Sequence, residues 1–277
     1  MTGPVVVGSD PSGVPLSWSL EWCGRTGDEL VVASAMVNNQ AEMPPDWHDE
    51  LMASALADLE ARIGRLEGSP SRPHRSVVLD GDPSDVITQV ADDEHASLVV
   101  VGARGSGGFH GLGLGGVAHH LSHHLHRPLV VVPQPGGPLG GGTIVVGIDG
   151  SDGSKIAGKW AVDAARRLDG SVHAVYAFDP VADSYGHGNV DNRIEQGEQD
   201  ARDQADEMAG HGVAVELTVI GEHPVKALID VGEQVNAGLI VSGTRGWGGF
   251  HGLVLGRIPA QLPHHSRRPV ALIHHDN

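Results

Sequence analysis

The sequence predicts an α/β protein of two tandem domains, each a five-stranded parallel sheet with helices on both faces. Valine-rich runs such as "PVVVG" alternate with stretches of helical spacing such as "DELMASALADLEARIGRL" (49–66). Such alternation is typical of parallel sheets covered by helices. The glycine-rich stretch "GARGSGGFHGLGLGG" (102–116) returns as "GTRGWGGFHGLVLGR" (243–257), which indicates that one unit is present twice.

The repeat extends beyond the glycine-rich stretches and defines the domains. "PVVVGSDPS" (4–12) matches "TIVVGIDGS" (143–151), and "SLVVVG" matches "GLIVSG". Between the halves lies "PQPGGPLGGG", rich in the two residues that interrupt regular structure. We therefore predict domains at 1–134 and 143–277, joined by a Gly/Pro linker at 135–142.

The elements follow from apolar runs and helical spacing. In the first half we expect strands at 4–8, 30–36, 76–80, 97–101 and 129–132, and helices that include 49–66 and 83–94. Residues 192–208 form a helix of the second half, with the acidic run 195–207 as its solvated face. Trp22 and Ala35 are four residues closer together than Trp160 and Ala177, so the first helix of the first half should be about one turn shorter.

Several aromatic and sulfur side chains are expected in the core. Trp18, Trp22 and Trp160 fall where the first helix of each half should face the sheet, and the single cysteine, Cys23, lies beside Trp22. A lone cysteine also excludes an intrachain disulfide framework.

Charge and hydropathy restrict the partners. Lys and Arg number 18 against 35 Asp and Glu, a formal charge of -17, which disfavours a nucleic-acid or anionic-membrane surface. No apolar run has the length of a membrane helix, and "MTGPVVVGSD" is unlike a signal peptide. We therefore expect a cytoplasmic protein with no nucleic-acid or membrane partner.

The repeated glycine loop joins a strand to a helix. Gly102 and Gly243 follow valine-rich strands, and Gly115 and Gly256 precede helical segments. Ligands of open parallel sheets bind at this edge, and amides at a helix amino terminus attract anions. Glycine allows a phosphate to approach the backbone closely, so the loop predicts a phosphate-binding site.

The spacing Gly-x2-Gly-x9-Gly, the "VVGSDPS" and "VVGIDGS" openings and the closing "RPLVVV" and "RPVALI" together resemble the universal stress protein family. The resemblance covers essentially the whole chain. It implies Rossmann-like domains of strand order 3-2-1-4-5 that bind ATP, with or without Mg2+, between the first and fourth strands. It also implies pairing of domains through their fifth strands, here within one chain; a homodimer and unidentified protein partners are left open.

The resemblance places the nucleotide carboxylate on Asp10 and Asp149, adenine contacts at the backbone of Ala35 and Ala177, and phosphates over the glycine loops. The candidate binding residues are Ser9, Asp10, Ala35, Gly102, Arg104, Gly105, Gly115, Gly116 and Val117 in the first domain, and Ile148, Asp149, Ala177, Gly243, Arg245, Gly246, Gly256 and Arg257 in the second. No catalytic or metal-ligating residue is predicted.

The two sites depart from the family pattern after the last glycine. Gly116 and Arg257 stand where nucleotide-binding members have Ser or Thr, a hydroxyl that caps the helix. Arg257 can either grip a phosphate or fill the pocket. Pro259 removes an amide from the first helical turn, and Pro263 should cut into the helix interior. We therefore expect the first domain to be the better nucleotide site.

Other motifs have simpler interpretations. "GLGLGG" (111–116) matches a dinucleotide fingerprint without a preceding strand, and "GSKIAGKW" (153–160) is an incomplete Walker A sequence inside a helix. The i, i+4 spacing in "HHLSHH" (119–124) can chelate a metal, but solvent-facing histidines explain it more simply. His110 and His251 are interpreted as exposed loop residues.

The predicted function is that of a nucleotide-binding, non-enzymatic stress-response regulator, in which ATP changes conformation or partner binding. A nucleotide-free interaction module of the same fold is the first alternative. A weak ATPase is the second, although no acid-base pair or complete Walker motif is evident.

Overall fold

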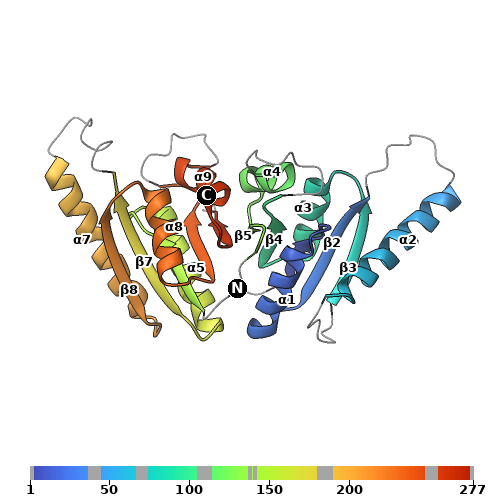
Figure 1. The fold of residues 1–277 in the computed structure, drawn as a ribbon, viewed down its shortest axis with the longest axis horizontal. Coiled ribbons are helices and arrows are strands. Elements are labelled where there is room, and N and C mark those ends of the chain that lie inside the picture. The colour runs from blue at the N-terminus through green and yellow to red at the C-terminus, as the bar shows by residue number, and fades with distance from the viewer. Residues whose placement is uncertain are drawn as a thin grey trace. The chain divides into compact units, whose positions relative to one another are not determined.

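A computed structural model of the chain describes residues 3–36, 45–66, 74–104, 114–136, 139, 142–179, 190–246 and 255–274. The chain divides into two compact units, Met1–Gly136 (unit 1) and Gly137–Asn277 (unit 2). Figure 1 shows the elements of both. Within the described residues, no helix has the length and apolar character required to cross a membrane.

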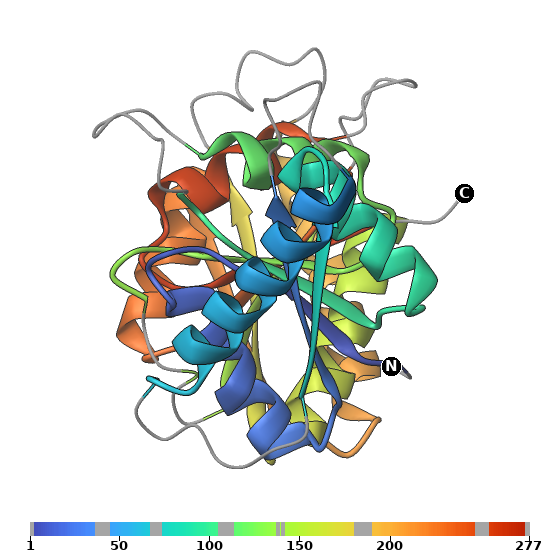
Figure 2. The same ribbon diagram turned by 90° about the vertical axis from the view of Figure 1, so that its right-hand side faces the viewer.

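Unit 1 is a parallel sheet of strand order β3-β2-β1-β4-β5. Its strands are β1 (Val5–Gly8), β2 (Leu30–Met36), β3 (His74–Asp80), β4 (Leu98–Gly102) and β5 (Leu129–Val132), and its helices are α1 (Val14–Thr26), α2 (Pro45–Ile63), α3 (Pro83–Asp93) and α4 (Gly116–His124). One core cluster joins the sheet to α3 and α4. Figure 2 shows α1 and α2 on the other side of the sheet from α3.

Unit 2 repeats this arrangement with the strand order β8-β7-β6-β9-β10. Its strands are β6 (Thr143–Gly147), β7 (Ser171–Phe178), β8 (Val215–Gly221), β9 (Leu239–Gly243) and β10 (Val270–Ile273), and its helices are α5 (Asp152–Arg167), α7 (Val190–Ala209), α8 (Pro224–Gln234) and α9 (Arg257–His265). Numbered within each unit, the strand order is 3-2-1-4-5. The predicted fold class is therefore confirmed.

Local sequence explains where several helices begin. Asp82 caps α3 by accepting a hydrogen bond from the Ser84 amide at 2.8 Å, and Pro83 stands at the first helical position, where an amide is not needed. Ser151 caps α5 by accepting from the Ser154 amide at 3.2 Å. Gly13, before α1, has φ 69°, a left-handed conformation that favours glycine.

The observed difference in length between the first helices of the two units is smaller than predicted. α1 has 13 residues and α5 has 16, so α1 is shorter by three residues and not by four. Trp22 and Trp160 are each the ninth residue of their helix, and three of the four extra residues lie in α5 after Trp160. The fourth lies between the end of α5 and Ala177, so the spacing overestimated the difference in helix length.

The predicted core residues are buried. Trp18, Trp22 and Trp160 are 3%, 1% and 7% exposed, and Cys23 is 2% exposed. The acidic run on α7 does face solvent along much of its length. Gln204 within it is an exception: its Nε2 donates to the carbonyl of Ser154 at 2.9 Å, which ties α7 to the start of α5.

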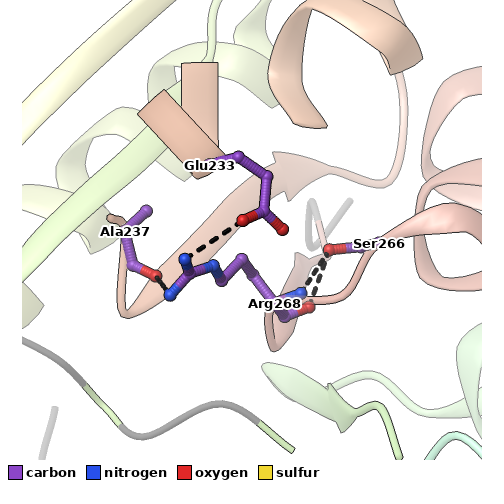
Figure 3. Close-up of polar contacts among 4 residues, drawn as sticks. All are labelled: Glu233, Ala237, Ser266 and Arg268. Atoms are coloured by element: carbon purple, nitrogen blue, oxygen red, sulfur yellow. Dashed lines mark hydrogen bonds and ion pairs between the residues drawn. The ribbon is translucent and has the colours of Figure 1, made fainter. Parts of the chain in front are cut away.

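The arginine of the second "RP" pair has a structural role. Arg268, just before β10, donates to the Ala237 carbonyl and to the Glu233 carboxylate, each at 3.2 Å, and Ser266 braces its backbone (Figure 3). Arg127 makes the corresponding contacts with α3 and the turn that follows it. These arginines lie at the amino ends of the strands, opposite the glycine loops, because each precedes the last strand of its unit.

Candidate functional site

The candidate site of unit 1 lies where the strand order reverses. β1 pairs with β2 on one side and with β4 on the other, and the connections from these strands leave in opposite directions along the sheet. Loops at the carboxyl ends of two such strands form the usual ligand crevice of an open α/β sheet. Ser9 and Asp10 follow β1, and Ala103 and Arg104 follow β4.

Asp10 has an unused hydrogen-bonding atom in this crevice. Its Oδ1 accepts a hydrogen bond from the Ser12 amide at 2.6 Å and another from the Ser12 hydroxyl. Its Oδ2 is buried and accepts no hydrogen bond from the residues that the structure describes. A buried acceptor without a donor costs free energy, so Oδ2 is the atom of this loop with most to gain from a ligand donor.

Position 102 has to be glycine because the Asp10 carboxylate leaves no room for a side chain there. A Cβ at position 102 would lie 2.5 Å from Asp10 Oδ2 and 3.2 Å from Cγ of Pro15. Any side chain would therefore displace the carboxylate or the start of α1. The glycine brings the end of β4 against the carboxylate that follows β1.

The amino terminus of α4 completes the unit 1 site. The Gly115 amide donates to the Ala103 carbonyl at 2.7 Å, which closes the loop and uses that amide. The first hydrogen bond of the helix is from His119 to Gly115, at 2.9 Å, so the amides of Gly116, Val117 and Ala118 have no carbonyl within the helix to donate to. Gly116 is exposed, with nothing within 4 Å of a Cβ placed there. This turn can therefore receive an anion.

Unit 2 packs differently at the same edge of its sheet. A Cβ at Gly243 would lie 2.6 Å from the Gly153 carbonyl oxygen, and a Cβ at Gly153 would overlap the Arg245 carbonyl. The loop after β9 therefore rests directly on the first turn of α5. Asp149 accepts hydrogen bonds from the Ser151 amide at 3.0 Å and hydroxyl at 2.5 Å, and a Cβ at Gly246 would overlap its carboxylate.

The amino terminus of α9 has one donor fewer than that of α4. Gly256 donates to the Thr244 carbonyl at 2.7 Å, as its counterpart does in unit 1. Proline stands at the third position of the helix, so among its first three residues only Arg257 and Ile258 have amide donors. Arg257 is exposed.

Pro263 lies inside α9, as predicted, but it does not interrupt the helix. The helix continues to His265, and the next amide, of Ser266, still donates to the Leu262 carbonyl at 3.0 Å. Pro263 lies in the last turn, so the missing amide removes one hydrogen bond at a point where the helix is about to end.

Sequence reasoning missed Arg62. This residue, in the last turn of α2, donates to Ser9 Oγ at 2.6 Å and so places a guanidinium at the carboxyl end of β1. The position of Ser9 in unit 2 is taken by Ile148, which is 3% exposed and makes no such contact. Arg62 and Ser9 are 53 residues apart, and no motif links them.

The remaining candidates are placed as follows. Ala35 and Ala177 lie near the carboxyl ends of β2 and β7, opposite Leu79 and Ile220 of the neighbouring strands. Arg104 is exposed, and Arg245 is partly exposed. Several residues lie outside the described residues: Gly105, His110, His251 and linker residues 137, 138, 140 and 141.

The interpretation of "GSKIAGKW" holds, and the histidines of α4 lie at the surface. "GSKIAGKW" lies within α5, with Trp160 buried, and so does not form a phosphate loop. His119, His120 and His124 are exposed, and His123 is partly exposed. Within the described parts of the chain, no group of three or more His, Cys, Asp or Glu side chains converges as a metal cluster.

Comparison with known proteins gives consistent results over the whole chain. The model of the universal stress protein family matches residues 4–133 and 142–274. Universal stress protein Rv2623 of Mycobacterium tuberculosis is 29% identical over 295 residues, covering 96% of this chain and 94% of the relative. Universal stress protein Rv1996 of the same species is 27% identical over 300 residues, covering 96% and 93%. A crystal structure of a universal stress protein from Archaeoglobus fulgidus shares the fold, with a TM-score of 0.77 at 19% identity over 99% of both chains.

Proposed function

The chain belongs to the universal stress protein family, and from this premise we propose that unit 1 binds ATP with Mg2+ at the carboxyl edge of its sheet. Occupancy then changes the conformation or the partner surface of the protein, which makes it a regulator of the stress response and not an enzyme. The observation that supports this most directly is the buried Oδ2 of Asp10, which lacks a donor among the described residues at the point where the strand order reverses.

The residues of unit 1 suit the parts of an adenine nucleotide. Asp10 would accept a hydrogen bond from a ribose hydroxyl, as acidic residues do in dinucleotide-binding folds. The amides of Gly116 and Val117 would donate to phosphate oxygens, and backbone near Ala35 would meet the adenine edge. Arg62 adds positive charge beside Ser9. The bound nucleotide would supply the polyanion that distinguishes the two states of the protein.

Unit 2 is proposed as the weaker site or as a site without nucleotide. Its helix α9 has no amide at Pro259, and Ile148 replaces the hydroxyl that Arg62 contacts in unit 1. Gly153 also packs its carbonyl against Gly243. Unit 2 would then act through a protein partner.

Calorimetric titration of Mg-ATP into three proteins tests the proposal. The proteins are wild type, Gly116→Glu and Gly116→Ser. Glutamate has room there and favours a helix amino terminus, so the fold should persist while like charge weakens ATP binding by about tenfold or more. Serine adds a capping hydroxyl and should strengthen binding.

Arg257→Glu in unit 2 is the matched control. It introduces the same carboxylate at the same helical position of α9, and we expect it to leave ATP affinity nearly unchanged. Absence of ATP binding by wild type at millimolar concentration would refute the proposal and favour a nucleotide-free interaction module. Phosphate release by wild type that is lost in Gly116→Glu would instead support the weak ATPase.

A further inference from the structure

The surface of α4 in unit 1 has an unusual concentration of histidine. His119 and His123 are one helical turn apart, with ring centroids 4.7 Å apart and planes inclined by 42°. His120 and His124 repeat the arrangement with centroids 4.5 Å apart and an angle of 39°. From this geometry we propose that the two pairs bind divalent transition-metal ions, with Cu2+ preferred over Zn2+.

The helix holds these side chains in place from its opposite face. Ala118, Leu121 and Leu125 are 1%, 0% and 2% exposed and belong to the core cluster that joins α4 to the sheet. Ser122 is 2% exposed, and its hydroxyl donates to the His119 carbonyl at 2.8 Å. Because the backbone is fixed by this packing, metal binding does not have to form the helix first.

The chemistry of the pairs suits borderline metal ions. Imidazole nitrogen is a good ligand for Zn2+ and Cu2+, and two histidines at i, i+4 are the spacing with which helical zinc sites bind metal. Imidazole must be neutral to bind a metal ion, so binding should weaken as pH falls.

The type of site follows from the number of ligands. Each pair supplies two imidazoles, and no larger converging cluster exists among the described residues, so water would complete the coordination. Such a site exchanges its metal and follows the general affinity order, in which Cu2+ binds more tightly than Zn2+. The proposal is independent of nucleotide binding.

Unit 2 contains a natural comparison. In α9, His264 and His265 correspond to His123 and His124, but Ala260 and Gln261 stand one turn earlier in place of histidine. The two adjacent rings are 6.5 Å apart. α9 therefore has histidines at the positions equivalent to His123 and His124, but neither has an i, i+4 partner. A comparison of the two helices distinguishes binding by a histidine pair from binding by single histidines.

Titration with Cu2+ in glycine buffer, which competes with single histidines, tests the proposal on the full chain. Wild type is compared with His119→Ala/His120→Ala and with the matched control His264→Ala/His265→Ala. Alanine favours an exposed helix, so both variants should fold. We expect the first variant to lose about two bound Cu2+ ions per chain and the control to lose none.

A thermal measurement gives a second readout. Because an ion bound only by the folded helix stabilises the native state, Zn2+ should raise the melting temperature of wild type and of the control, but not of the first variant. The proposal is overturned if the first variant keeps the wild-type number of Cu2+ ions and the Zn2+ shift, or if both variants lose them equally.

Discussion

At the scale of single residues, equivalent glycines of the two units contact different neighbours. Gly102 lies against the Asp10 carboxylate and Pro15, whereas Gly243 lies against the Gly153 carbonyl. Both glycines are the last residue of the fourth strand of their unit, and the sequence motif does not distinguish them. Internal packing therefore explains why neither position tolerates a side chain, and the proposed ligand-binding role rests on Asp10 and the α4 amides.

Arg268 allows a prediction about stability. Its side chain is 15% exposed and ties the end of α8 and the following turn to the start of β10. Arg268→Ala should lower the free energy of unfolding by about 1.5–3 kcal/mol, the range for hydrogen bonds to charged groups. Chemical denaturation monitored by circular dichroism measures the loss.

Glu233→Gln is the control for this prediction. Glu233 is 45% exposed, so its ion pair is screened by solvent, whereas the bond to the Ala237 carbonyl remains in this variant. We expect a clearly smaller loss than for Arg268→Ala. Equal losses in the two variants would show that the ion pair, and not the carbonyl contact, is the main contribution.

At the scale of elements, α2 is joined to β3 by a hydrogen bond that involves a titratable histidine. His48 of α2 forms a hydrogen bond with Asp80 at the end of β3, and this bond, followed by the charge of Asp80, raises the pKa of His48. The folded state therefore binds this proton more tightly than the unfolded chain. The stabilisation is fully present below the unfolded pKa of about 6.5 and disappears as pH rises through the folded value.

This contact predicts a measurable pH dependence. Titration of the histidine ring signals by NMR should give His48 a pKa above 6.5, and Asp80→Asn should lower it toward that of an exposed histidine. His48→Gln should flatten the corresponding part of the curve of stability against pH. An unchanged His48 pKa in Asp80→Asn would contradict the assignment.

At the scale of the whole molecule, each unit has a core of its own. One cluster joins the strands of unit 1 to α3 and α4, and another joins those of unit 2 to α8 and α9. Domains of this size bury enough apolar surface to fold alone. We therefore propose that residues 1–136 and 137–277 are independent folding units.

Separate expression of the two fragments tests this proposal. Each should show α/β circular dichroism and a cooperative thermal transition, with the melting curve of the full chain as the reference. A fragment that is unfolded alone but becomes folded on addition of the other would show that the units depend on each other for stability.

Much of the fold could be predicted because its signals are local. The alternation of valine runs and helical stretches, the repeat and the tryptophan positions each depend on residues close in sequence, and hydrophobic burial acts on them in both copies alike. The misjudged length of α1 depends on where each helix ends before the next strand, and the uninterrupted α9 depends on the place of Pro263 within its helix. Residue type alone reveals neither.

The sequence by itself determined that this chain contains two copies of one α/β unit, with a glycine loop between strand and helix in each. Only the tertiary structure decided what the carboxyl ends of the strands touch: Asp10 against Gly102, Gly153 against Gly243, and Arg62 on Ser9. The physical reason is separation along the chain. The periodicity of hydrophobic residues depends only on residues that are close in sequence. A contact between residues far apart in sequence exists only after the sheet has brought the carboxyl ends of its strands together.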